Sequence, residues 1–211
     1  MSWDKISENI LQSAQSTSMA EWIATITAVI YVILAARENI FCWHFGAISS
    51  ALSVAVYFHE QLYFESLLSI AYCIISVYGW WEWKNQKNGK GKRVNGTRTI
   101  ARLDFKTAII LLLIGIFMSA VCGGISFYYK TSQLPFADAT ITIFSILATW
   151  MTAKKILENW IVWIMIDAAD AGIYIYKGPS LYLFAILFIF YTFIAVAGYF
   201  SWKKKLLPSI A

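Results

Sequence analysis

The sequence predicts an all-helical, polytopic membrane protein, and three observations carry this prediction. Apolar residues make up 59% of the 211 residues and charged residues only 14%, a balance that no soluble domain of this size needs. Seven apolar segments are long enough to cross about 30 Å of hydrocarbon, which takes roughly 17–25 helical residues. Residues of the first half also recur in the second half, in the same direction.

The seven expected transmembrane helices cover residues 19–36, 40–58, 62–83, 105–128, 136–153, 160–176 and 180–202. Barrel strands are excluded, because the segments are uniformly apolar and do not alternate. The three prolines lie at segment ends or in the tail, so we expect no proline kink within a helix. Residues 1–18 lack an apolar core and a cleavage site, which favours an amphipathic or flexible lead-in over a signal peptide.

The internal repeat defines the expected domain organisation. Glu38-Asn39, Trp43, Tyr72, Gly79 and Trp83-Lys84 recur 119 or 120 residues later as Glu158-Asn159, Trp163, Tyr191, Gly198 and Trp202-Lys203. A second three-helix unit keeps the orientation of the first only if one extra helix returns the chain, which gives a 3+1+3 arrangement of parallel repeats. The expected units are 1–83, a basic linker 84–104, a connecting helix and loop 105–134, and 135–211.

Lys and Arg residues gather in alternate connections between the segments. Three of the 17 lie on one side, Lys5, Lys130 and Lys177. The other fourteen share the opposite side: Arg37, Lys84, Lys87, Lys90, Lys92, Arg93, Arg98, Arg102, Lys106, Lys154, Lys155, Lys203, Lys204 and Lys205. The positive-inside rule then places the N-terminus outside and the C-terminus in the cytoplasm. Membrane topology accounts for the net charge of +5 without a nucleic-acid partner.

The sixth segment carries the residues that are hardest to place in a membrane. Asn159, Trp163, Asp167, Asp170 and Tyr174 follow one another at spacings of four, four, three and four, which puts them on one helical stripe. A carboxylate near the middle of a membrane costs on the order of 2.5–3.5 kcal/mol, and two of them on one helix repel each other. We therefore expect the stripe to face a cavity that binds a solute.

The corresponding stripe of the first half is expected to be uncharged, with Asn39, Trp43, Ala47 and Ser50. A chamber lined by Trp43, Trp163 and Trp150 next to two carboxylates suits a flat, cationic, polar solute. Packing is an equally good interpretation of these three tryptophans. The tryptophans at the ends of the segments, Trp80, Trp81, Trp83 and Trp202, are more typical of interfacial anchors.

Other classes of function have less support. Cys42, Cys73 and Cys122 lie in apolar segments, and the two histidines have no partners at metal-ligand spacing, so neither disulfides nor a metal or other cofactor is expected. An aspartyl protease needs carboxylates on opposed elements, whereas Asp167 and Asp170 lie on one expected helix. A retinal-type photoreceptor needs a lysine within the last segment, and residues 180–202 contain none. An ion-coupled pump with the two aspartates as a proton relay remains open as an alternative.

The chain resembles the PnuC family of bacterial vitamin transporters, which share the 3+1+3 organisation of the SWEET sugar carriers. The matching strings are ENIFCWHFGAISS, LYFESLLSIAY with VYGWWEW, and AKKILENWIVWIMIDAADAGIYIYKG. The resemblance implies facilitated diffusion of nicotinamide riboside across the bacterial inner membrane, without energy coupling. It also implies a homo-oligomer such as a trimer, with Trp163, Asp167, Trp43 and Asn39 lining the site.

Three positions depart from the pattern of this family. His44 replaces a proline, and Ser69 and Thr149 replace glutamines at positions expected to face the substrate. Loss of two amides removes groups that can read a carboxamide or a ribose. Thiamine, which a related branch transports, is therefore kept as an alternative substrate. A phosphorylated nucleotide fits less well, because no Lys or Arg lies deep in a segment to meet its phosphate.

Overall fold

The computed structural model describes residues 3–60, 63–85 and 100–206, and all of its regular elements are helices. Leu62, Pro208 and residues 86–99 of the expected linker lie outside this range. The helices are α1 (Trp3–Ser16), α2 (Met19–Ala36), α3 (Cys42–His59), α4 (Tyr63–Lys84), α5 (Phe105–Tyr129), α6 (Pro135–Ala153), α7 (Asn159–Lys177), the 3₁₀ turn η1 (Pro179–Leu181) and α8 (Tyr182–Leu206).

Local sequence signals set several of the helix ends. Ser18 and Glu21 form a reciprocal capping box that separates α1 from α2. Asp104 accepts a hydrogen bond from the Thr107 backbone N–H at 3.0 Å and so caps α5. Gly178 ends α7 at φ 114°, a conformation that other residues rarely adopt. The lead-in before α2 is thus a helix, which the sequence left undecided.

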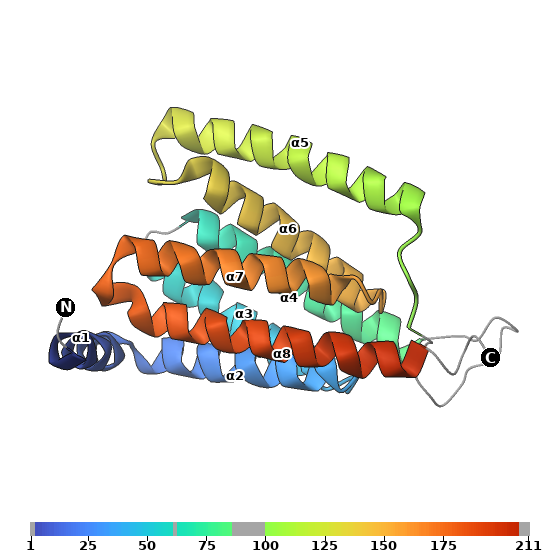
Figure 1. Cartoon of the computed structure of the whole chain (residues 1–211), viewed down its shortest axis with the longest axis horizontal. Helices are drawn as coiled ribbons and strands as arrows, with labels where there is room; N and C mark the ends of the chain where they lie inside the picture. Colours follow the sequence, from blue (N-terminus) through green and yellow to red (C-terminus); the bar gives the residue numbers. More distant parts are fainter. Residues whose placement is uncertain (1–2, 61–62, 86–99, 207–211) are drawn as a thin grey trace, which may run out of the picture.

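The long helices α2 to α8 run roughly along one direction, and α1 crosses one end of the bundle (Figure 1). In chain order α2 packs on α3 and α3 on α4, while α6 packs on α7 and α7 on α8. Contacts of α4 with α6 and of α2 with α8 join these two groups. Helix α5 packs mainly on α6, where Gly115 and Gly123 let the rings of Phe144 and Phe136 approach closely.

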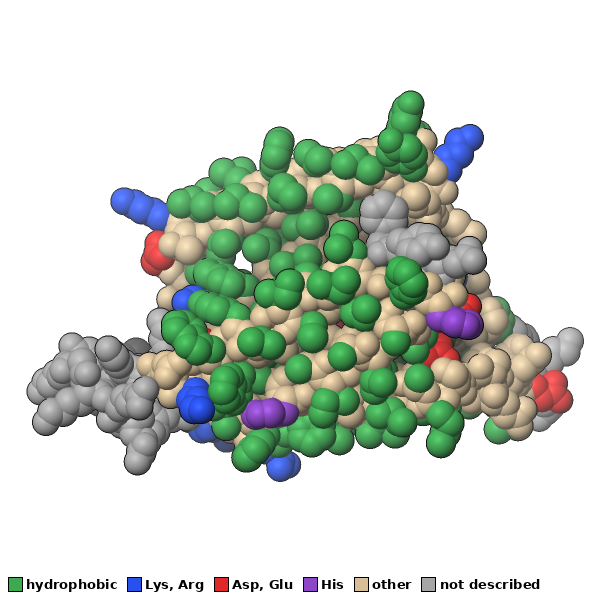
Figure 2. Space-filling model, turned by 180° about the vertical axis from the view of Figure 1, so that it is seen from behind, with side chains coloured by type: hydrophobic (Ala, Val, Ile, Leu, Met, Phe, Trp, Pro, Cys, Tyr) green, Lys and Arg blue, Asp and Glu red, His purple; other side chains and the backbone are tan. Residues whose placement is uncertain are grey.

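The surface of the bundle is that of a membrane protein. Hydrophobic side chains cover most of the face seen in Figure 2, and charged side chains gather toward its two ends. Four described helices are both long and apolar enough to cross a membrane: Met19–Ala36, Phe105–Tyr129, Pro135–Ala153 and the continuous Pro179–Leu206. Helices α3, α4 and α7, of 18, 22 and 19 residues, contain more polar residues. The chain is therefore a multi-pass membrane protein.

The best-packed core lies at one end of the bundle, which we call the basic end because Lys154, Lys155 and Lys203–Lys205 lie there. Trp43, Trp83, Trp160 and Trp202 form a continuous band of indole rings across it. Centroid distances along the band are 5.4 Å for Trp43–Trp83, 6.5 Å for Trp83–Trp202 and 5.4 Å for Trp202–Trp160. Both outer contacts are edge-to-face, a geometry that stabilises aromatic pairs beyond their burial.

Two turns at the basic end have the same backbone. Glu38 follows α2 at φ 58° and Lys155 follows α6 at φ 53°. In each turn this residue donates its N–H to the carbonyl three residues before it, and the next residue donates five residues back. This is the Schellman motif, which ends a helix by satisfying its last carbonyls. Helices α3 and α7 then begin four residues after Glu38 and Lys155 respectively.

Candidate functional site

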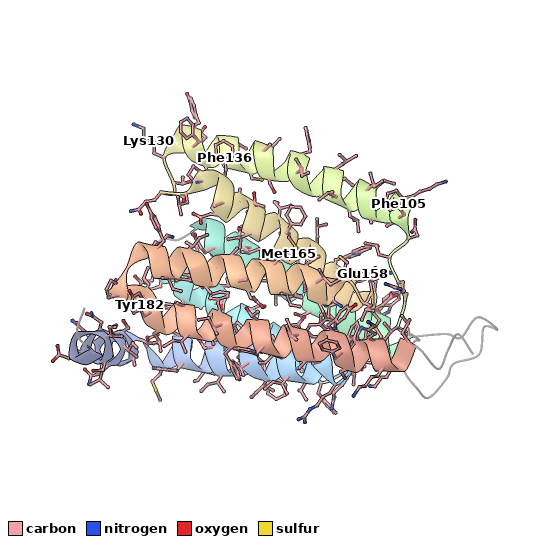
Figure 3. All side chains as sticks on the ribbon, viewed as in Figure 1. Phe105, Lys130, Phe136, Glu158, Met165 and Tyr182 are labelled. Carbon is pink, nitrogen blue, oxygen red and sulfur yellow. The ribbon has the colours of Figure 1, made fainter. Side chains whose placement is uncertain are left out.

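Two carboxylates lie inside the bundle on α7. Asp167 is 4% exposed, Asp170 is half-buried, and their charges act on each other. Met165, labelled in Figure 3, is 69% exposed and marks the outer face of the same helix. Among the described residues, no Lys, Arg or His forms an ion pair with either aspartate. The expected carboxylate pair is thus present and turned away from lipid.

Tyrosines of several helices lie within electrostatic reach of these carboxylates or of one another. Tyr72 of α4 lies close enough to both Asp167 and Asp170 for their charges to act on its hydroxyl. Tyr191 of α8 is within the same reach of Asp167. Further tyrosines connect to this group through Tyr72 or Asp170: Tyr31 of α2, Tyr57 of α3 and Tyr174 of α7. We call these five tyrosines with Asp167 and Asp170 the central cluster.

Sequence analysis selected only Tyr174 among these tyrosines. Its ring stacks between Phe184 and Phe188 of α8, at centroid distances of 5.6 and 5.4 Å. A usable signal was present for the others, because Tyr72 and Tyr191 recur 119 residues apart.

Several serine and threonine hydroxyl groups are buried inside the bundle. Ser145 of α6 is 4% exposed and lies beside the Tyr72 hydroxyl. The hydroxyl of Ser69 donates to the carbonyl of Glu65 at 2.9 Å, and that of Thr149 donates to the carbonyl of Ser145 at 2.7 Å. The two positions expected to have lost a glutamine therefore use their hydroxyl protons within their own helices. Ser50 of α3 is also buried.

The two asparagines of the predicted stripes do not occupy matching places. Asn159 is fully buried at the start of α7, where it accepts from the Thr152 hydroxyl and donates to the carbonyl of Ile156. Asn39 is exposed and accepts from the backbone N–H of Phe41 at 3.0 Å. Both side chains form hydrogen bonds within turns at the basic end.

The expected equivalence of Trp43 and Trp163 is wrong. Trp43 and Trp160 are 1% and 2% exposed, and each packs on a glycine of the helix that ends its own half, Gly79 or Gly198. Each also meets the terminal tryptophan of that helix edge-on. Trp163 is only partly buried and packs against the outside of this core. Trp160, which sequence analysis did not single out, is therefore the counterpart of Trp43.

This register changes the comparison of the two stripes. Counted from the matching turns at Glu38 and Lys155, the position of Asp167 in α7 corresponds to Ser50 in α3. By the same count Tyr174 corresponds to Tyr57. The difference between a charged and an uncharged stripe remains, but the counterpart of Ser50 is Asp167 and not Asp170.

Trp150 borders an apolar hollow between α4, α5 and α6. The hollow has a volume of about 330 Å³, and it is also lined by Ile75 of α4, Leu111 and Ile114 of α5, and Ile146 and Leu147 of α6. All of these side chains are apolar, and α5 forms one wall. The expected chamber of three tryptophans is not assembled, because Trp43 packs in the basic-end core and Trp150 faces this hollow.

The side chains of the central cluster are chemically suited to a polar cation. The cluster combines aromatic rings with carboxylates and hydroxyls, and these polar groups are costly in a membrane interior unless they are paired or hydrated. Within the described residues, no group of three His, Cys, Asp or Glu side chains is arranged to hold a metal ion.

The chain is similar to known transporters along most of its length. Residues 18–204 match the model of a family described as nicotinamide mononucleotide transporter. The nicotinamide riboside transporter PnuC of Escherichia coli is 25% identical over 206 residues, covering 88% of this chain and 85% of its own length. That of Neisseria mucosa is 21% identical over 191 residues, covering 86% and 71%.

One solved structure has the same fold. The crystal structure of the vitamin B3 transporter PnuC superposes with a TM-score of 0.69 at 19% identity, covering 96% of this chain and 90% of that one. The family match extends over all seven long helices, and its members are transporters, not enzymes. The chain belongs to the PnuC family of membrane transporters.

Proposed function

We propose that the protein carries nicotinamide riboside across the bacterial inner membrane by facilitated diffusion. The observation that carries this proposal is the buried Asp167 carboxylate, which has no cationic partner among the described residues and lies among tyrosines. A cationic aromatic ring supplies the missing charge and stacks on the rings around it. The curated relatives named above are nicotinamide riboside transporters.

The proposed scaffold is a pair of parallel three-helix repeats, α2–α4 and α6–α8, joined by α5, with seven membrane crossings. The N-terminus is outside and the C-terminus in the cytoplasm, as the distribution of Lys and Arg predicts. The two repeats rock about the central cluster and expose it to each side in turn. Each protomer of a homo-oligomer, for which a trimer is our working model, contains one such pathway.

The proposed substrate contacts come from the central cluster. Asp167 and Asp170 attract the positive ring, and Tyr72, Tyr174 and Tyr191 provide aromatic faces and hydroxyls. Trp163 lies on α7 with the two aspartates, and Ser69 lies on α4 with Tyr72. Both are secondary candidates. Trp43, Trp150, Asn39 and Asn159 act through packing and turn geometry instead, according to their places in the structure.

A free riboside fits this site better than the phosphorylated mononucleotide in the family description. A phosphate requires Lys, Arg or clustered backbone N–H groups, and it is repelled by carboxylates. Lys177, whose charge acts on Asp170, lies at the end of α7. The central cluster therefore selects a solute with positive charge and no phosphate.

Thiamine remains the second candidate substrate. It is also a flat aromatic cation, and the hydroxyls of Ser69 and Thr149 are already bonded to their own helices. Neither position then offers the donor and acceptor pair with which an amide reads a carboxamide. Proton-coupled transport is a further alternative, because Asp138, Asp170 and Asp167 act on one another in sequence from the end of α6 inward.

The test is transport by purified protein in liposomes, with labelled nicotinamide riboside, thiamine and nicotinamide mononucleotide measured side by side. We expect riboside to equilibrate down its gradient, with a rate that an added proton ionophore leaves unchanged. Thiamine uptake alone would assign the other branch, and accumulation driven by an imposed proton gradient would overturn uniport. Movement of none of the three would overturn the substrate assignment.

A further inference from the structure

The two matching turns at the basic end bear opposite charges, and these charges meet. Glu38, after α2, places Oε2 2.9 Å from Nζ of Lys155, after α6. The side chains are 3% and 1% exposed, so the pair is almost completely buried. Equivalent positions of two parallel repeats can touch only at the axis that relates them. The ion pair therefore lies on the seam between the halves.

A second lysine completes the arrangement around Glu38. Nζ of Lys205, in the last turn of α8, lies 2.8 Å from Oε1 of Glu38. Lys205 is 53% exposed and therefore forms the solvent side of the cluster. Both lysines come from the second half and the carboxylate from the first. All of the attraction in this cluster consequently acts between the halves.

Indole groups reinforce the same seam. The Lys155 ammonium lies over the ring of Trp83, 4.4 Å from its centroid. The indole N–H of Trp83, from the first half, donates to the carbonyl of Ala153 in the second half at 3.0 Å. That of Trp202, from the second half, donates to the carbonyl of Ala35 in the first half at 3.2 Å. Each half thus donates one buried indole hydrogen bond to the other.

We propose that Glu38, Lys155 and Lys205, with Trp83 and Trp202, form a gate that closes the basic end of the pathway and opens by separation of the two halves. The inference rests on the proposed transport function, because a gate has meaning only if the central cluster is reached from both sides. It adds the residues that must part when the protein opens toward this end.

The chemistry of the contact suits a device that opens repeatedly. Each partner of a buried ion pair regains hydration when the seam opens, which offsets much of the attraction that is lost. An apolar seam of the same area exposes hydrocarbon to water on opening and gains nothing in return. The pair therefore holds a closed state without making the open state inaccessible, as a two-state element requires.

The chain contains its own reporter for this gate. Cys42 is fully buried in the basic-end core and lies within electrostatic reach of Lys155. Cys122 lies on α5, remote from the seam, and is partly exposed. The experiment measures alkylation of each cysteine by N-ethylmaleimide in the full-length protein in liposomes, read by peptide mass spectrometry. Wild type is compared with Glu38→Gln and Lys155→Met.

The matched control is Arg102→Met. Arg102 forms an ion pair with Glu158 at 3.3 Å at the same end of the bundle, but the Arg102 side chain is 67% exposed and comes from the linker, so this pair does not join the two repeats. We expect Cys42 to react about tenfold faster in Glu38→Gln and Lys155→Met, as the open population rises, with Cys122 unchanged. Arg102→Met should match wild type.

Two results would overturn the gate. In the first, Cys42 reacts at the wild-type rate in both variants. In the second, Cys42 and Cys122 accelerate together, which means that the pair holds the whole fold and not one seam. The measurement needs no substrate, so a failure of riboside transport in the liposome assay leaves its outcome readable. The gate and the substrate assignment are thus tested separately.

Discussion

Trp43 and Trp160 have the same surroundings in two different parts of the chain. Each is buried, packs on a helix glycine and meets a terminal tryptophan edge-on at 5.4 Å. Each also buries an indole N–H that has no acceptor among the described residues. Such a group is costly in a core, and its presence in both places shows that ring packing determines these positions.

The close approach of these rings to glycine gives a first prediction. A Cβ atom at Gly79 would lie 2.5 Å from the Trp43 ring, and one at Gly198 would lie 2.8 Å from Trp160. Gly79→Ala and Gly198→Ala should each destabilise the protein by about 1–3 kcal/mol through overpacking. Gly172→Ala is the control, because nothing lies within 4 Å of its Cβ position. Thermal unfolding in detergent measures the difference, and equal loss in all three would contradict the packing argument.

The hydrogen bonds across the seam give a second prediction. Trp83→Phe and Trp202→Phe remove the donors to the carbonyls of Ala153 and Ala35. Each should lower the free energy of unfolding by about 1–3 kcal/mol, since a buried carbonyl loses its side-chain partner. Trp81→Phe, at a site that is 54% exposed, should have little effect. Equal denaturation midpoints for the three variants would argue against these bonds.

Asp167 should affect stability and transport in opposite directions. Asp167→Asn removes a charge that is costly to bury, so the protein should become more stable by on the order of 1 kcal/mol. The same change should lower the apparent affinity for a cationic substrate about tenfold, which corresponds to about 1.4 kcal/mol of lost attraction. Glu8→Gln, on the exposed face of α1, is the control. Thermal unfolding and riboside uptake by one preparation test both signs together.

The tyrosines of the central cluster should contribute through their hydroxyls. Tyr72→Phe and Tyr191→Phe keep the rings near Asp167 but remove groups that can bond to a ribose. We expect each to weaken riboside binding by about 1 kcal/mol, or roughly fivefold. Tyr176→Phe, 83% exposed at the end of α7, should bind as wild type does. Titration calorimetry of the purified variants gives the affinities.

The ion pair at the basic end predicts a dependence of stability on acid. Burial raises the pKa of Glu38, but Lys205 and Lys155 outweigh this effect and hold the pKa below its usual value of 4.5. The ionised carboxylate therefore stabilises the fold above pH 4.5, and this contribution is lost as the pH falls through the lower folded-state pKa. Between about pH 5 and about pH 3, Glu38→Gln should lose less stability than wild type. Urea unfolding of the two proteins at both pH values measures this loss, and an equal loss in the two proteins would contradict the assignment.

The amino-acid sequence is sufficient to predict the helices, because apolar segments of membrane length leave few alternatives. It also predicts that Asp167 and Asp170 face inward, since a carboxylate toward lipid is too costly. It misses α1 as a defined helix, because a short amphipathic segment gains its order from contacts with η1 and α8 that only the fold provides.

The errors at the site come from register. Glu38-Asn39 and Glu158-Asn159 look like the same motif, but the turn before α7 begins three residues earlier relative to that motif. A helix end is set by backbone hydrogen bonds that residue identity specifies only weakly. Residues that match in sequence can therefore occupy different positions relative to the starts of α3 and α7. The sequence also does not reveal that Glu38 and Lys155 are equivalent, because a glutamate and a lysine at matching positions do not appear as a repeat.

The two Schellman turns have a consequence for how such proteins diverge. Glu38 and Lys155 adopt a left-handed backbone that favours glycine and costs other residues roughly 1 kcal/mol. A glycine at either position would relax the chain but remove its charge. Exchange of either residue for glycine thus relieves backbone strain but removes the ion pair of the proposed gate, and the amino acids at these two positions offer a simple criterion for sorting related sequences by how firmly the basic end is held closed.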